Sequence, residues 1–143
     1  MTEKEILAKV IIEVVGAPKE HVEKAVDTII ERISKNNLFR MIKKSTFNAE
    51  KIEQKELENF WSAFAEFDIA FKNIKDLIGF CFDYMPSSIE IIEPETFALD
   101  VGKISDLLND LLARLHQYDF VVKNLRAENM MLKKEKGEIK QEE

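Results

Sequence analysis

Apolar and polar residues alternate in three short segments of the first two thirds of the chain, which predicts β-strands there. The segments are residues 8–15, 60–71 and 88–92, and every second residue in each of them is apolar. A period of two places one set of side chains on a single face of a strand. We expect Ile89 and Ile91 to face the core from the last segment. Residues 38–47, LFRMIKKSTF, are less regular and predict a further strand.

Two other segments repeat apolar residues every three to four positions, which is the spacing of an amphipathic helix. The first, residues 19–34, follows a break at Gly16-Ala17-Pro18 and ends before Asn36. The second begins at Asn73, whose spacing from Asp76 fits a capping box, and is stopped by Pro86. The residues that we expect this helix to turn toward the core are Ile74, Leu77, Ile78, Cys81 and Met85.

The order of these elements is strand, helix, strand, strand, helix, strand. That order predicts an α+β, ferredoxin-like β-α-β-β-α-β domain over residues 1–98, with an antiparallel sheet and two helices on one face. Right-handed connections place the strands at residues 8–15 and 60–71 in the centre of the sheet. Residues 48–58 are polar and predict a loop or a short helical connection.

The last third of the chain carries a seven-residue repeat, with nine apolar or aromatic residues at its ten a and d positions. Such a repeat predicts a helix over residues 99–135 that forms a parallel two-stranded, leucine-zipper-like coiled coil. Residues 136–143 then form a charged, disordered tail. The alternatives are a helix folded back onto its own sheet and an antiparallel four-helix bundle. The expected dimerisation residues are Val101, Ile104, Leu108, Leu111, Leu115, Tyr118, Val122, Leu125, Asn129 and Leu132.

The polar residues of the repeat indicate the direction of pairing. Asn129 occupies an a position, where a buried Asn favours a parallel dimer in a fixed register. In a parallel pair, Arg114 faces Asp119 of the second chain and Glu128 faces Lys133. Both pairs join opposite charges, so they select this direction.

The charge of the chain argues against nucleic acid as a partner. Residues 1–98 carry 13 Lys and Arg against 18 Asp and Glu, and residues 99–143 carry 8 against 9. Neither part has the basic excess that phosphate binding needs. A DNA-binding basic zipper requires a basic helix entering its coil, whereas residues 90–100 are acidic and contain Pro94. RNA binding through Phe60 and Phe64 is the less favoured alternative, because the strand lacks the pattern of an RNA-recognition sheet.

The predicted sheet face opposite the helices combines acidic and apolar side chains. Its carboxylates, on Glu13, Glu66, Asp68 and Glu90, could hold a hard cation. Charged outer faces are common in open antiparallel sheets, so we expect no metal site. The apolar residues need a cover, which favours a protein partner. They form a candidate partner-binding surface of Ile11, Val15, Phe60, Phe64 and Ile92.

No set of residues for catalysis or for a cofactor emerges. Cys81 is the only cysteine and is expected to be a core thiol, and the four glycines form no phosphate-binding loop. His21 and His116 lack a second ligand at zinc-binding spacing. No signal peptide or membrane span is recognisable. We therefore expect a cytoplasmic protein that is not an enzyme and that binds no cofactor, DNA or membrane.

Residues 69–95 resemble the end of the ferredoxin-like C-terminal extension of WYL-type bacterial regulators and the ACT-like sensory arrangement. The resemblance rests on a strand followed by NIKDLIGFCFDYM and then SSIEIIEPE. The basic ligand-sensing residues of the WYL core have no counterpart here. The resemblance implies the fold and suggests a sensing role.

Two functions follow as expectations. The first is a non-enzymatic, homodimeric assembly or adaptor protein that presents two globular heads on a coiled coil to another protein. The alternative is an ACT-like module whose paired heads sense a small molecule. An enzyme with a site completed by a partner is a third reading, with no converging acid, base or nucleophile to support it.

Overall fold

The computed structural model describes residues 4–54 and 59–137, and these form an antiparallel sheet with two helices, followed by a long helix. The chain divides into two units, with the boundary between Phe97 and Ala98. The elements of the first unit are β1 (Ile6–Gly16), α1 (Lys19–Lys35), β2 (Phe39–Thr46), β3 (Glu50–Lys51), β4 (Trp61–Phe71), α2 (Ile74–Tyr84) and β5 (Ser88–Glu93). The second unit contains α3 (Val101–Glu135).

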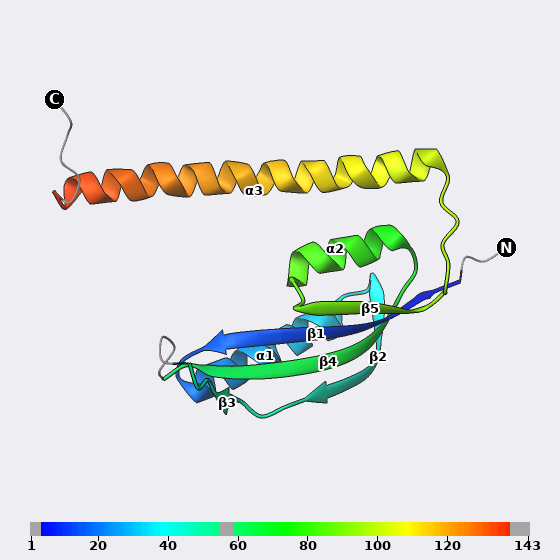
Figure 1. Cartoon of the computed structure of the whole chain (residues 1–143), viewed down its shortest axis with the longest axis horizontal. Helices are drawn as coiled ribbons and strands as arrows, with labels where there is room; N and C mark the ends of the chain where they lie inside the picture. The colour runs from blue at the N-terminus through cyan, green and yellow to red at the C-terminus, as the bar shows by residue number, and fades with distance from the viewer. Residues whose placement is uncertain (1–3, 55–58, 138–143) are drawn as a thin grey trace. The chain divides into compact units, whose positions relative to one another are not determined.

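The sheet has the predicted order of strands. Its order is β2-β4-β1-β5, so β1 and β4 are central, and all pairs are antiparallel (Figure 1). The short β3 pairs with the start of β4, opposite Ser62 and Trp61. This strand was not predicted, since it falls in the segment expected to be a loop or a short helix. Residues 55–58 of that segment lie outside the described residues.

The core lies between one face of the sheet and the two helices. Even-numbered residues of β1 pair with odd-numbered residues of β4, from Ile6 opposite Phe71 to Val14 opposite Ala63. Paired residues point to the same side of a sheet, so the two apolar sets form one continuous face. The buried residues that the helices pack against this face are Val22, Val26, Ile30 and Ile33 of α1 and Leu77 and Phe80 of α2.

The inward face of α2 differs from the prediction. The N-terminus is as expected, because the Asn73 side chain accepts a hydrogen bond from the Asp76 N–H at 2.8 Å. The fully buried aromatic residue is Phe80, whereas Cys81 is only half-buried. Phe80 packs against the rings of Phe39, Phe71 and Tyr84, with centroids 4.8 to 5.4 Å apart. The buried contact of this part of α2 is therefore made by the ring of Phe80 and not, as predicted, by the thiol of Cys81.

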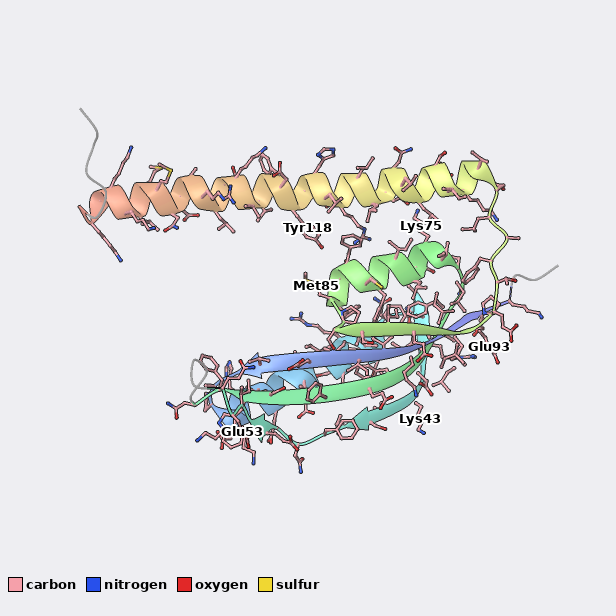
Figure 2. All side chains as sticks on the ribbon, in the orientation of Figure 1. Lys43, Glu53, Lys75, Met85, Glu93 and Tyr118 are labelled. Carbon is pink, nitrogen blue, oxygen red and sulfur yellow. The ribbon has the colours of Figure 1, made fainter. Side chains whose placement is uncertain are left out.

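Met85 was wrongly predicted to face the core. The helix ends at Tyr84, and Met85 adopts a left-handed conformation with φ 45° while its N–H bonds to the Cys81 carbonyl at 3.0 Å. This conformation ends the helix, so the side chain of Met85 does not continue the core-facing side of α2. Met85 is accordingly 75% exposed at the end of α2 (Figure 2).

Strand β5 has the predicted orientation but not the predicted burial. Ile89 pairs with Val10 and Ile91 with Ala8, which places both isoleucines on the core side of the sheet. They remain 37% and 40% exposed, because β5 is an edge strand at the margin of the layer covered by the helices. The sequence thus predicted the correct face for Ile89 and Ile91 but overestimated how deeply they are buried.

Helix α3 is continuous over 35 residues and begins where the heptad pattern begins. The Asp100 side chain caps its N-terminus by accepting a hydrogen bond from the Lys103 N–H at 2.8 Å. Among the described residues, no helix is long and apolar enough to cross a membrane. Residues 138–143 of the predicted charged tail lie outside the described part of the chain.

Candidate functional site

The first candidate site is the line of a and d residues along α3, which we call the seam. It consists of Val101, Ile104, Leu108, Leu111, Leu115, Tyr118, Val122, Leu125, Asn129 and Leu132. No residue of α3 is buried within the single chain, and every seam residue except the half-buried Leu111 is exposed. A contiguous apolar stripe of this length is the kind of surface that a protein covers by association.

Charged residues beside the seam already form contacts within one helix. The carboxylate of Asp119 and the ammonium of Lys123, one turn later, are 2.8 Å apart. This hydrogen-bonded ion pair lowers the pKa of Asp119 and raises the pKa of Lys123. The carboxylate is therefore charged at neutral pH and loses its small helix-stabilising contact as the pH falls through its lowered pKa.

The second candidate site is the outer face of the sheet, on the side away from the helices. Glu13 pairs with Phe64 and Val15 pairs with Ser62, so Phe64 lies diagonally between Ile11 and Val15. Phe60 directly precedes β4 and is even-numbered, like Phe64, so we place it on this outer side by strand alternation. Four of the five predicted residues thus lie on one part of the outer face. We call this group, Ile11, Val15, Phe60 and Phe64, the outer patch.

Ile92 lies at the opposite end of this face from Val15. It lies where the register of β5 shifts, between the pairs Ile91–Ala8 and Glu93–Leu7. At 3.4 Å per residue along β1, that position is about 12 Å from Ile11 and about 25 Å from Val15. The sequence could not show this separation, because alternation indicates a face of a strand and not a position along its neighbour.

Phe47 is a residue of the outer patch that the sequence analysis missed. Its N–H donates to the Phe64 carbonyl at 3.1 Å, which extends the pairing of β2 and β4 by one step. Since Ser45 opposite Glu66 points outward, strand alternation places Phe47 outward beside Phe64. Phe47 is 53% exposed. Phe47 is the last residue of the strand predicted at residues 38–47, and this position was the signal that could have placed it on the sheet.

Polar contacts also lie on the outer face, and one of them is next to Phe64 within the outer patch. The Ser62 hydroxyl donates to Glu13 at 2.9 Å, and Lys9 lies 3.4 Å from the carboxylate of Glu66. Two of the four predicted outer carboxylates therefore have protein partners. Throughout residues 4–54 and 59–137, no three His, Cys, Asp or Glu side chains gather closely enough to hold a metal ion.

A shallow hollow lies beside the edge strand β2, with a volume of about 500 Å³. Cationic and amide groups dominate its polar lining. The hollow is a third candidate site because such groups can bind an anion. Its lining residues are Ser34, Asn36, Asn37, Phe39, Arg40, Met41, Ile42, Lys43 and Lys44.

Cys81 has no feature of a catalytic thiol. It is half-buried, and this burial raises the pKa of its thiol. A raised pKa disfavours the thiolate, which is the nucleophilic form. His21 and His116 are both exposed, one on α1 and one on α3.

The comparisons with known proteins cover both units. The model of the MJ0538 family matches residues 7–142. The chain belongs to the MJ0538 family. The uncharacterized protein MJ0538 of Methanocaldococcus jannaschii is 34% identical over 96 residues, which are 67% of this chain and 35% of that protein. The chain thus spans about a third of the length of the curated relative that it matches. No solved structure matches the chain.

The family match has one structural consequence. Because it extends from residue 7 to residue 142, the MJ0538 family model includes the outer patch, the hollow and the whole seam. The combination of a small antiparallel sheet with a long C-terminal helix is therefore contained in the matched region. The resemblance of residues 69–95 to WYL-type regulators stays a prediction.

Proposed function

We propose that this protein is a non-enzymatic, homodimeric adaptor that presents two sheet domains to another protein. Its α3 helices form a parallel two-stranded coiled coil through the seam. Each sheet unit, with its β-α-β-β-α-β order and its two added residues of β3, is a ferredoxin-like head. The outer patch is the surface of the head that contacts the partner.

The observation that carries the proposal is the exposure of the seam. None of the 35 residues of helix α3 is buried in the single chain. Most helical stability in proteins comes from packing an apolar face, so an unsupported helix of this composition is marginal in water. Burying one Leu or Val side chain contributes about 1.5–3 kcal/mol. Pairing the seams of two chains supplies this burial along the whole helix.

The parallel direction rests on particular side chains. Asn129 meets its own copy only when the two helices run in the same direction and in register. In that register Arg114 faces Asp119 of the second chain, where it adds a second cation beside a carboxylate that already contacts Lys123. Exposed pairs of this kind contribute only a few tenths of a kcal/mol each, so they select the direction more than they stabilise it.

Disulfide trapping tests both the seam and its direction. In a Cys81→Ser background, Leu132→Cys places one thiol at a d position near the C-terminus of α3. A parallel dimer brings the two introduced thiols together, and we expect a covalent dimer under mild oxidation. An antiparallel pair keeps the thiols at opposite ends of the helices, so failure to cross-link would contradict the parallel coil.

A matched control uses the opposite side of the same helix. Ala127→Cys in the same background places the thiol at an f position, which points away from the seam. We expect no covalent dimer from this variant at low protein concentration. Equal cross-linking of both variants would indicate random collision and would remove the support for the seam.

Partner binding by the outer patch has its own test. Phe64→Ser and Phe47→Ser remove exposed rings at the centre of the patch, and both should abolish co-purification of a partner with the tagged full-length protein. Leu38→Ser replaces a comparably exposed apolar residue outside the patch and serves as the control. A partner retained by both patch variants would contradict the assignment of this surface.

A small-molecule sensing role is the second candidate, and the hollow beside β2 supports it. The hollow is lined by Arg40, Lys43 and Lys44 of the edge strand β2, and the guanidinium of Arg40 lies 3.0 Å from the carboxylate of Glu5. A thermal-shift screen of amino acids, nucleotides and divalent metals tests this role. Saturable stabilisation by one anionic compound, lost in Arg40→Ala, would favour sensing, because a ligand stabilises the state that binds it. No shift with any compound would reject it.

A further inference from the structure

Helix α3 carries a second regular pattern on the side opposite the seam. The f positions of the heptad repeat are Asp106, Ala113, Phe120, Ala127 and Lys134, and all five are exposed. We call this line the outer stripe. Phe120 is 66% exposed, and a coiled coil through the seam leaves it so, because f positions point away from the partner helix. Phe120 therefore marks the middle of a surface that the proposed dimer does not cover.

The outer stripe is complementary to its own copy when the copy runs in the opposite direction. In an antiparallel pair centred on Phe120, the residue n positions before Phe120 faces the residue n positions after it in the other chain. Ala113 then faces Ala127, and Asp106 faces Lys134. In this arrangement each acidic residue faces a basic residue, each alanine faces an alanine, and the two phenylalanines face each other.

We propose that the outer stripe is a second self-association surface, through which two coiled-coil dimers join antiparallel into a tetramer. Because each dimer carries two such stripes, one on each helix, further dimers can add at the stripes that stay free. The occupant of the stripe is another copy of this chain. The two Phe120 rings meet on the two-fold axis, as the self-complementary nature of such an interface requires. The contact uses no seam residue, so it goes beyond the proposed dimer and can be tested separately.

The size of the flanking residues fits close helix packing. The distance between packed helices is set by the side chains at the contact, at about 8–10 Å. Ala113 and Ala127 extend no further than Cβ, so they leave room for the helices to approach on both sides of the Phe120 pair. Asp106 and Lys134 lie about 21 Å from Phe120 along the axis, at 1.5 Å per residue, where they end the stripe with opposite charges.

The overall charge of α3 favours the same direction. Residues 100–119 carry four acidic and two basic side chains, whereas residues 120–137 carry two acidic and five basic ones. A parallel dimer places like halves side by side. An antiparallel contact between two dimers places the acidic half of each against the basic half of the other, which offsets that repulsion.

Sedimentation of the full-length protein over a range of concentrations tests the tetramer. We expect the wild type to change from two chains to four, and then to larger even-numbered assemblies, as the concentration rises. Phe120→Ala should weaken the second step about tenfold or more and leave the dimer intact, since a central aromatic side chain dominates a small interface. Leu38→Ala, at a comparably exposed apolar residue in the other unit and outside the outer patch, should leave both steps unchanged.

Charge reversal tests the antiparallel register. Asp106→Lys sets two Lys side chains against each other, and Lys134→Asp sets two Asp side chains against each other, so each single change should weaken the tetramer. The double variant, Asp106→Lys with Lys134→Asp, restores two opposite pairs and should restore the tetramer. All these positions are exposed, so the fold is not at risk.

The outcomes separate this proposal from the proposed dimer. A wild type that stays a dimer at the highest concentration would overturn the outer stripe and leave the seam standing. A dimer abolished by Phe120→Ala would support the stripe and contradict the seam. A tetramer unaffected by Phe120→Ala, or a double charge variant that fails to recover, would overturn the antiparallel stripe.

Discussion

Individual side chains determine which surfaces of this protein are buried and which are available for contacts. Phe67 is fully buried under the helices, whereas Phe47 and Phe64, on the same pair of strands, are exposed on the other side of the sheet. The two-residue period predicted which residues of β4 face the core. It missed Phe47, because that residue follows two lysines and a serine that obscure the alternation.

Replacing these phenylalanines should give very different losses of stability. Phe67→Ala removes a fully buried ring and should lower the free energy of unfolding by about 3–5 kcal/mol. Phe47→Ala removes an exposed ring and should change it by less than about 0.5 kcal/mol. Chemical denaturation of both variants checks the contrast. Equal losses would show that the two faces of the sheet are assigned wrongly.

Asn129 is a residue whose proposed role depends on a second chain. If the helices pair in parallel, Asn129 is buried in the coil and stabilises a register at the cost of stability. Asn129→Ile should therefore raise the melting temperature while allowing oligomers larger than a dimer. Calorimetry and sedimentation measure the two effects. An unchanged melting temperature with a strict dimer would mean that Asn129 does not set the oligomeric state.

At the scale of the elements, ends and edges were the hardest features to predict. The sequence signals for the start of α2 were sufficient, since Asn73 and Asp76 form the expected cap. Pro86 predicted that α2 ends near residue 85, but the exposure of Met85 was not predicted, because Met85 carries no local signal for a left-handed conformation. The exposure of Ile89 and Ile91 on β5 depends on how far the helices extend over the sheet, which is a property of tertiary packing.

The cap of α2 gives a prediction at this scale. Asn73→Ala removes the acceptor for the Asp76 N–H and should destabilise the protein by about 1 kcal/mol. Asn73→Asp keeps an acceptor oxygen and should cost much less. Urea denaturation of the two variants provides the measurement. Equal stability of Asn73→Ala and the wild type would show that the cap contributes nothing.

At the scale of the whole molecule, the chain combines a packed sheet unit with a helix that has no core of its own. The heptad pattern predicted the limits of α3 within two residues, because one long period is a stronger signal than several short strands. What covers the seam is a matter of assembly. The apolar stripe follows from the sequence of one chain, whereas its cover depends on a second chain.

The mass of the full-length protein in solution tests the central claim most directly. Sedimentation equilibrium at low micromolar concentration should give a dimer. A variant with Leu115→Glu and Leu125→Glu should give a monomer, because the added charges lie in the seam. The control, Gln117→Glu with Asn124→Glu, adds the same charges at c positions and should remain a dimer. A monomeric wild type, or a seam variant that still forms the same dimer, would contradict the account.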